Sequence, residues 1–273
     1  MKNRPFSMYF IYGWLFLFAF IPIVLVIAVS FLSDNSVHLA SLPWTVTSYK
    51  NIFSLVFANI LFRSIIVSSI TTLICLALAY PFTYIIIKSK HQALLLSLII
   101  IPFWTSSLVR TYSMIAILKL NGILNYILLK LHVINHPITF LYSNFAVICG
   151  LVYNLFPFMV LPLFSNMERF DFKLIEAAKD LGANRFVIFF RVFLPNTLQG
   201  IIAGSLMIFL PAMTLFYIPN ILGGARSVLL GNLIQNQFLV TENWPAGAAT
   251  SVVLTLTLLM LLSFYRPKKE IAL

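Results

Sequence analysis

Long apolar stretches alternate with short polar ones along the chain, and six of them are long enough to cross a membrane as helices. A spanning helix needs about 20 mostly apolar residues. The stretches that qualify are residues 10–32, 60–87, 93–113, 139–164, 198–218 and 245–265. Several contain a proline, which a spanning helix tolerates where neighbouring groups satisfy the freed carbonyl. The pattern predicts an all-α membrane protein with six transmembrane helices, forming a single domain over residues 1–273.

The composition agrees with a membrane protein. Hydrophobic residues make up 61% of the chain and charged residues 9%, whereas an average soluble domain has about 25% charged residues. A soluble globule of this composition would expose a large apolar patch. The net charge of +11 raises nucleic acid as a partner, but the basic residues are scattered and form no stripe interleaved with aromatic residues. We therefore expect contact with lipid and none with nucleic acid.

The chain lacks the groups that membrane-embedded catalysis or ion coupling uses. No Asp, Glu or His lies within the six apolar stretches, and the two cysteines have no metal-ligand spacing. Inverted repeats, which many ion-coupled carriers show, are not evident either. No G-x-x-x-x-G-K-[ST] segment occurs, so the chain has no P-loop of its own. We expect no catalytic, metal or cofactor site here, and any energy from ATP has to come through a partner.

Lysine and arginine residues gather on one side of the predicted membrane. If the N-terminus is cytoplasmic, most of the 18 basic residues fall in cytoplasmic segments. These are Lys2, Arg4, Lys88, Lys90, Arg169, Lys173, Lys179, Arg185, Arg191, Arg266, Lys268 and Lys269. Because positive residues favour the cytoplasmic side, this bias predicts that both termini are cytoplasmic. The one long cytoplasmic loop is then residues 166–196.

That loop contains a polar segment, "LIEAAKDLGANRF", at residues 174–186. Apolar residues recur in it at i, i+3, i+4 and i+7, which predicts a short amphipathic helix. They are Leu174, Ala177, Ala178 and Leu181. Gly182 ends the helix, because a left-handed cap favours a residue without Cβ. From the residues alone two interpretations stay open: an elbow that packs under its own helices, or a plug for the groove of a soluble partner.

The spacing of this loop resembles the cytoplasmic coupling motif of ABC importer permeases. The motif reads Glu-Ala-Ala from residue 176, Gly at 182 and Leu-Pro at 194–195, with Val192 where the family usually has isoleucine. Four further stretches resemble the B-type permease subunits of spermidine/putrescine importers, in the binding-protein-dependent transport inner-membrane family. They are "PFWTSSLVRTY" at 102–112, "GLVYNLFPFMVLPLFSNME" at 150–168, "LPAMTLFYIPNILGG" at 210–224 and "NWPAGAATS" at 243–251.

The resemblance implies a multi-pass permease with the type I ABC importer fold in the bacterial inner membrane. It assigns to ATPase coupling the residues Glu176, Ala177, Ala178, Asp180, Gly182 and Pro195. Glu176 would be the ionic contact, the two alanines the close-packing surface and Gly182 the turn that orients the second helix. The implied partners are two ATPase subunits, which would bind ATP–Mg, a homologous C-type permease and a periplasmic polyamine-binding protein.

A path for polyamines would be expected to carry carboxylates, and none lies in the apolar stretches. Two explanations stay open: recognition resides in the binding protein and the partner permease, or ammonium groups pass along aromatic faces, at about 0.5–2 kcal/mol for each contact. The candidate path residues are Trp104, Tyr112, Tyr153, Asn154, Phe216 and Tyr217, and the candidates for a periplasmic rim are Arg110, Glu242 and Trp244. Trp104 is expected deep in the third stretch. Packing or lipid contact is the alternative for each aromatic, and headgroup contact for Arg110. An importer for another organic cation or an anionic solute is the alternative function.

Overall fold

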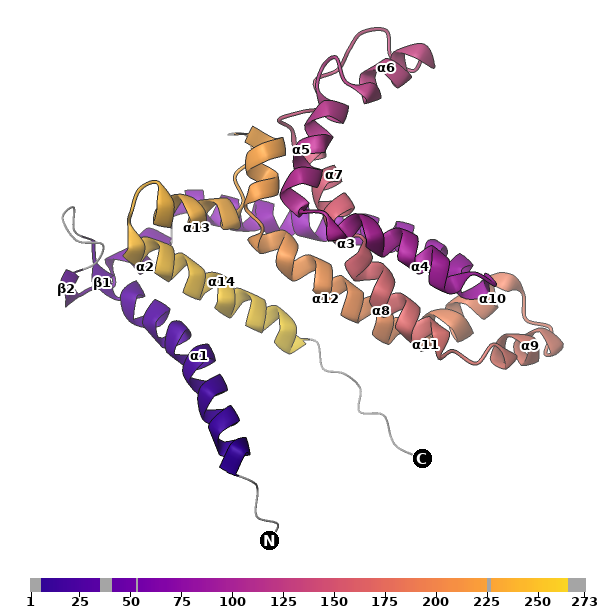
Figure 1. Cartoon of the computed structure of the whole chain (residues 1–273), viewed down its shortest axis with the longest axis horizontal. Helices are drawn as coiled ribbons and strands as arrows, with labels where there is room; N and C mark the ends of the chain where they lie inside the picture. The colour runs from indigo at the N-terminus through magenta and orange to yellow at the C-terminus, as the bar shows by residue number, and fades with distance from the viewer. Residues whose placement is uncertain (1–5, 35–40, 53, 225–226, 265–273) are drawn as a thin grey trace. The chain divides into compact units, whose positions relative to one another are not determined.

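The computed structural model describes residues 6–34, 41–52, 54–224 and 227–264 (Figure 1). Within these residues five helices are long and apolar enough to span a membrane, or up to six if a bent pair counts as one span. They are Ile11–Ser30, Leu55–Lys88, Ser107–Lys130, Arg185–Thr214, Trp244–Ser263 and the pair Asn144–Leu155 with Pro157–Glu168. The predicted all-α membrane architecture is therefore confirmed. The last residue of the predicted stretch 245–265, and the basic residues at both termini, lie outside the described residues.

The third predicted span, residues 93–113, is not one helix. A short apolar helix, α4 (Gln92–Ile100), continues as η1 (Ile101–Trp104) and stops, and α5 (Ser107–Leu118) begins after it. Pro102 has no N–H to extend the helical ladder. The Thr105 hydroxyl donates to the Pro102 carbonyl at 2.7 Å, and the Thr105 backbone is extended. The prediction of one continuous span was wrong because the helix breaks here. The Thr105 hydroxyl satisfies the carbonyl of Pro102 in place of a helical N–H. The candidate span in this region is Ser107–Lys130 instead.

Two compact units make up the chain, unit 1 with Met1–Leu61 and Leu230–Leu273, and unit 2 with Phe62–Leu229. Helix α3 (Leu55–Lys88) begins in unit 1 and lies mostly in unit 2. The other elements of unit 1 are α1 (Phe6–Ser30), β1 (Leu32–Ser33), β2 (Ser41–Trp44), α2 (Thr47–Ile52), α13 (Leu230–Leu239) and α14 (Trp244–Phe264). Unit 2 adds α4, η1, α5, α6 (Ile123–Lys130), α7 (Asn144–Leu155), α8 (Pro157–Glu168), α9 (Lys173–Asp180), α10 (Arg185–Ile188), η2 (Phe189–Phe193), α11 (Leu194–Asn196), α12 (Leu198–Thr214) and η3 (Pro219–Gly223). The single domain expected from the sequence stays a prediction.

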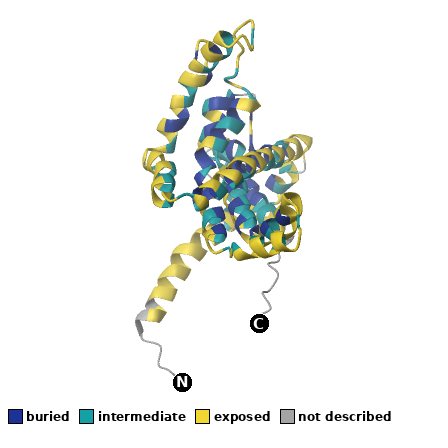
Figure 2. Ribbon diagram, turned by 90° about the vertical axis from the view of Figure 1, so that its right-hand side faces the viewer, coloured by how far each residue is buried: buried dark blue, intermediate teal, exposed yellow. Residues whose placement is uncertain are grey.

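Unit 1 is built around α14. Helices α1, α2 and α13 all pack against it, and β1 and β2 pair antiparallel. The hydroxyls of Ser30 and Tyr49 are hydrogen-bonded at 2.7 Å, and Asn243 donates to the Asp34 carboxylate at 2.7 Å. Most of α1 is exposed (Figure 2). Such an apolar exposed surface is what a helix surrounded by lipid presents.

The core of unit 2 is built from buried side chains of several helices, α3, α7, α8 and α12 among them, and α8 and α12 run side by side (Figure 1). Two glycines of α12 allow this close approach, because a Cβ at either position would clash with α8. A Cβ at Gly204 would lie 2.6 Å from the Met159 sulfur, and one at Gly200 would lie 2.7 Å from the Asn166 Cβ. Small residues four apart are the usual means by which spanning helices pack closely. Helices α7 and α8 meet at Pro157 with a bend of 44°. This packing fixes the frame from which the loop 166–196 extends.

Candidate functional site

The predicted amphipathic helix is α9, and it ends as the sequence indicates. Gly182 has a left-handed φ of 77°. Its N–H donates to the Lys179 carbonyl at 2.8 Å, and the Ala183 N–H donates to the Ala178 carbonyl at 3.0 Å. These two bonds form a Schellman motif, which satisfies the last carbonyls of a helix and favours glycine in the left-handed position. The turn predicted at Gly182 is confirmed.

A second helical run follows this turn. The Asn184 side chain accepts a hydrogen bond from the Val187 N–H at 2.9 Å and so caps α10. The run continues without a gap as the π-helical η2 and then α11. Pro195 lies just past η2, and since it has no N–H it cannot donate to the carbonyl of Arg191 in an α-helical bond. A wider helical turn next to such a proline accommodates the missing bond.

The apolar side of α9 is divided between the protein and the solvent. Leu174 is 46% exposed, Leu181 is 88% exposed and Ala177 is exposed as well. Ala178 and Ile175 are partly buried, and Ile175 packs against the core of unit 2. The predicted face is thus divided, since α9 rests on the unit by the side that carries Ile175 and Ala178 is partly buried there. The other three predicted positions are left uncovered by this chain.

Exposed apolar side chains continue from α9 onto the second run. Phe186 is 76% exposed and Phe190 is 60% exposed. We define the loop face as Leu174, Ala177, Leu181, Phe186 and Phe190. The carboxylates of Glu176 and Asp180 belong to exposed residues on the same helix. An elbow packed under its own helices would bury this apolar surface, whereas a surface that receives a partner is uncovered in the isolated chain. The exposure favours the partner-binding interpretation.

An aromatic cluster underlies α9 and joins the loop to α3. The ring of Phe193 meets that of Phe170 edge to face at 5.1 Å, and it meets Tyr84 and Tyr80 of α3 at 5.3 and 5.9 Å. The Tyr80 hydroxyl is hydrogen-bonded to the Thr197 hydroxyl at 2.8 Å. Such ring pairs contribute about 0.5–1.5 kcal/mol each beyond buried area. Packed rings therefore connect η2 and the start of α12 to a spanning helix.

A second group of candidates meets on α5, away from α9 (Figure 1). The hydroxyls of Tyr217 and Ser107 are hydrogen-bonded at 2.8 Å. The Asn154 side chain is buried, and its amide donates to the Gly150 carbonyl at 2.9 Å and to the Thr111 hydroxyl at 3.3 Å. Two predicted path residues, Tyr217 and Asn154, are therefore hydrogen-bonded to hydroxyl side chains of α5.

Arg110 lies on this face of α5 but is not exposed at a rim. Its side chain is 9% exposed, and its guanidinium carbon lies 3.9 Å from the ring centre of Phe103 and 5.8 Å from that of Tyr153. Within the described residues, the buried Nε and Nη1 of Arg110 have no hydrogen-bond partner. Two rings cover the side chain in this chain, and its assignment to a periplasmic rim stays a prediction. The guanidinium keeps its charge, so a cation is buried beside the predicted path residue Tyr153.

The other aromatic path candidates are not gathered on this face. Trp104 is 83% exposed at the end of η1 instead of deep in a span, because the helix stops there. Tyr112 is 59% exposed and Phe216 is 41% exposed, with the Phe216 ring 6.2 Å from that of Tyr217. Their contribution to a path stays a prediction.

Two rim candidates belong to unit 1. Glu242 is exposed with a left-handed φ of 53°, and Trp244 is 39% exposed at the start of α14. The Trp244 ring meets the Phe238 ring edge to face at 5.7 Å. The structure describes them separately from Arg110, which belongs to unit 2, so a shared rim stays a prediction.

The sequence analysis missed three residues at this site, Ser107 and Thr111 of α5 and Phe103 of η1. A signal for two of them was present, since Ser107, Arg110 and Thr111 lie at i, i+3 and i+4 and so share one side of a helix. Phe103 lies seven residues before Arg110, which is also a same-side spacing, although the helix is interrupted between them.

Comparison with known protein sequences gives close relatives. Residues 85–266 match the family described as "Binding-protein-dependent transport system inner membrane component". The chain is 45% identical over 271 residues to the "Spermidine/putrescine transport system permease protein PotB" of Haemophilus influenzae, with 98% of this chain and 95% of the relative covered. It is also 45% identical over 262 residues to the protein of the same name from Escherichia coli strain K12, with 95% of each covered.

Solved structures share the fold at low sequence identity. A bacterial ABC transporter involved in the import of the acidic polysaccharide alginate matches with a TM-score of 0.73 at 15% identity, covering 92% of this chain and 89% of that one. The alginate transporter in complex with an alginate pentasaccharide-bound periplasmic protein matches with a TM-score of 0.73 at 14% identity, covering 94% and 90%. These matches show that the chain has the fold of ABC importer permeases.

Proposed function

Because the chain belongs to the family of binding-protein-dependent transport system inner membrane components, we propose that it is the permease subunit of an ATP-driven ABC importer for the polyamines spermidine and putrescine. The observation that carries this proposal is the 45% identity to PotB permeases over almost the whole of both chains. Nearly complete coverage means that the spans, the loop and the connections between them are all shared with proteins of that name.

The proposed assembly contains several other subunits. This chain would form half of the translocation path, with a homologous C-type permease forming the other half. Two ATPase subunits would bind ATP–Mg, since this chain has no P-loop segment. A periplasmic binding protein would deliver the polyamine, and the similar fold of an alginate transporter bound to its periplasmic protein supports a partner of that kind.

The proposed orientation places both termini and the loop 166–196 in the cytoplasm. The bias of lysine and arginine supports it, because positive residues concentrate on the cytoplasmic side of membrane proteins. In this orientation the loop face is turned toward the compartment that contains ATP.

In the proposed coupling step, α9 and the loop face dock into a cleft on an ATPase subunit. Glu176 would make the ionic contact and Leu181 would enter an apolar part of the cleft. Closure of the ATPases around ATP would move α9, and Gly182 would keep the second run at a fixed angle to it. The aromatic cluster would pass this movement to α3, through the contacts of Phe193 with Tyr80 and Tyr84.

The proposed path uses aromatic and amide groups in place of carboxylates. Tyr153, Asn154 and Tyr217 surround the α5 face. Ammonium groups that pass aromatic rings make weak contacts, and weak sites suit transport because a tight site would retain the substrate.

A second candidate function is import of an anionic solute, and Arg110 is the observation that favours it. A buried guanidinium beside the path candidates repels a polycation and attracts an anion. The two functions differ in the effect of removing this charge. Spermidine uptake should survive Arg110→Met, whereas uptake of an anionic solute should be lost.

The test is uptake of labelled spermidine in cells that lack other polyamine importers. The cells co-express this chain with its ATPase, partner permease and binding protein. Wild-type cells are compared with a Glu176→Ala, Gly182→Val double variant that reaches the membrane in equal amount. As the matched control, Glu168→Ala removes another exposed carboxylate, outside α9.

We expect uptake by the wild type and by the control, and loss of uptake in the double variant. Equal uptake by the double variant would mean that the loop does not couple to ATP. No spermidine uptake by any of them, with the complex assembled, would contradict the polyamine assignment, and the same cells would then be tested with anionic solutes.

A further inference from the structure

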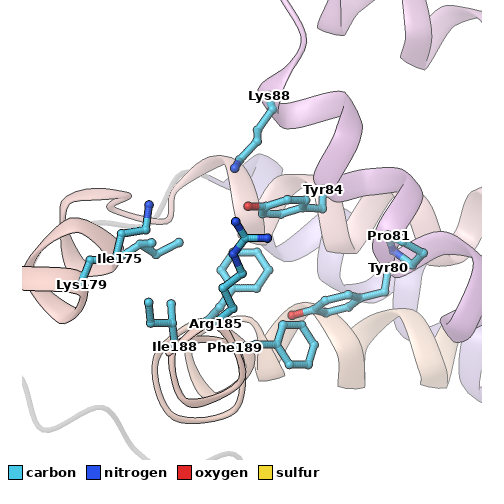
Figure 3. Close-up of a pocket in the computed structure, with 10 residues that line it drawn as sticks. Tyr80, Pro81, Tyr84, Lys88, Ile175, Lys179, Arg185, Ile188 and Phe189 are labelled. Atoms are coloured by element: carbon cyan, nitrogen blue, oxygen red, sulfur yellow. The ribbon is translucent and has the colours of Figure 1, made fainter. Parts of the chain in front are cut away.

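A pocket of about 690 Å³ opens beside α9 within unit 2 (Figure 3). Its walls come from four elements: α3, α9, α10 and η2. The rings of Tyr80, Tyr84, Phe189 and Phe193 line it, and Ile175 and Ile188 add aliphatic surface. Elements distant in the sequence therefore build one concave site, which the coupling role of the loop does not require.

Three cations on exposed residues line this pocket. Lys88 comes from the end of α3, Lys179 from α9 and Arg185 from the start of α10. None of the residues that line the pocket is acidic. The Lys88 ammonium lies 4.4 Å from the centre of the Tyr84 ring, and Figure 3 shows the Arg185 guanidinium extending toward the same ring from below. Three like charges on separate elements repel one another, and a bound anion would offset that repulsion.

The chemistry of the three cations suits a phosphate group. The Arg185 guanidinium presents a planar fork of donors that matches two phosphate oxygens, and lysine ammonium groups act as point charges for the others. Charge-assisted bonds of this kind are about twice as strong as neutral ones. The aromatic and aliphatic residues of the lining are uncharged, so they suit the uncharged part of a ligand that carries such a phosphate.

The position of the pocket indicates where the phosphate comes from. Lys88 is the last residue of the span Leu55–Lys88, so the pocket lies at the end of a membrane-crossing helix. Lipid headgroups occupy that level of a bilayer, and basic pockets between spanning helices bind anionic lipids. Free phosphate in the cytoplasm is the other source of the same group.

We infer that this pocket binds the phosphate group of an anionic ligand, and that in the membrane this ligand is the headgroup of phosphatidylglycerol. The assignment of the pocket to the cytoplasmic side rests on the proposed function, but binding of the lipid to the chain does not. A phosphate held by Lys88, Lys179 and Arg185 joins α3, α9 and α10 across the pocket. Bound lipid therefore stiffens the loop against the spanning helix that receives its movement.

The experiment measures lipid retention by the purified full-length chain in a mild nonionic detergent, using native mass spectrometry. Phosphatidylglycerol is added in one arm, phosphatidylcholine in a second and inorganic phosphate as a competitor in a third. The pocket variant is Lys88→Gln, Arg185→Gln. The matched control is Lys173→Gln, Arg191→Gln, which removes the same charge from exposed residues that do not line the pocket.

We expect one retained phosphatidylglycerol on the wild type and on the control, and about tenfold weaker retention by the pocket variant, because two charge-assisted contacts are lost. Binding of inorganic phosphate by the wild type, without retention of either lipid, would support the phosphate site but overturn the lipid assignment. Equal retention by the two charge-loss variants, or equal binding of phosphatidylcholine, would overturn the inference.

Folding of the pocket variant is checked by its elution profile and its unfolding temperature without added lipid. Lys179→Gln alone changes only an exposed side chain of α9, so it tests the same site if the double variant does not fold. Spermidine uptake is not part of the readout. The lipid-binding result therefore does not depend on whether the chain transports spermidine, and each proposal can fail without the other.

Discussion

The guanidinium carbon of Arg110 lies 3.9 Å from the ring centre of Phe103. Seven residues of continuous α-helix would separate the two backbones by about 10.5 Å along the axis. The chain between them is not one continuous helix, because η1 ends before Thr105 and α5 begins after Ser106. A buried cation thus stacks on a ring across the break between η1 and α5.

Replacement of Arg110 should separate stacking from charge. Arg110→Lys keeps the charge but loses the planar group that stacks, and it buries a more strongly hydrated ammonium. We expect it to lower the unfolding free energy of the chain by about 1–3 kcal/mol. Arg110→Met removes the buried charge and keeps much of the volume, so its effect should stay within about 1.5 kcal/mol. Thermal unfolding of the purified chain in detergent measures both. Equal stability of the wild type and the lysine variant would show that the ring contact contributes nothing.

The sequence predicted those structural features that depend only on neighbouring residues. The helix α9 and its end at Gly182 follow from spacing and from one residue without Cβ, and both are present in the structure. Contacts that depend on other parts of the chain could not be predicted from it. One example is the packing of α9, which rests on the core by Ile175 while Ala178 is partly buried. Arg110 is buried because a ring from another helix, that of Tyr153, approaches it, and periodicity along α5 contains no information about α7.

The glycine at the end of α9 gives a second prediction. A Cβ at Gly182 would meet no atom within 4 Å, so the cost of Gly182→Ala is conformational and comes from its φ of 77°. We expect a loss of about 1 kcal/mol in the stability of the turn. Spermidine uptake should fall, because α9 and the second run lose their fixed angle.

Gly13→Ala is the matched control, since a Cβ there also meets nothing within 4 Å but the residue lies inside α1. It should leave uptake unchanged, because alanine favours helix over glycine. Hydrogen exchange at the amides of Gly182 and Ala183 reports the turn directly. Unchanged exchange in Gly182→Ala would mean that the Schellman bonds tolerate alanine.

The loop face gives a third prediction. Leu181 is 88% exposed in this chain, so Leu181→Ser should change the stability of the chain by no more than about 0.5 kcal/mol. If Leu181 enters a cleft on an ATPase, the same change removes a buried leucine from the interface and weakens it by about 1.5–3 kcal/mol. Copurification of the ATPase with the chain measures the second effect. Leu131→Ser is the control, because Leu131 is 66% exposed in a different loop of unit 2. Equal recovery of the ATPase with both variants would remove Leu181 from the interface.

The close packing of α8 on α12 gives the last prediction. Gly204→Val places a Cβ 2.6 Å from the sulfur of Met159 and adds two methyl groups beyond it. Such overpacking costs about 1–3 kcal/mol, so the unfolding temperature of the chain should fall. Shortening the opposing side chain with Met159→Ala creates room but leaves a cavity when introduced alone. The double variant Gly204→Val, Met159→Ala should therefore be more stable than the sum of the two single changes predicts. The added valine fills the cavity left by Met159, and the loss of Met159 removes the clash with the valine. Strict additivity would mean that the helices separate at Gly204 instead of holding their spacing, because the Met159 backbone also lies 3.3 Å from the added Cβ.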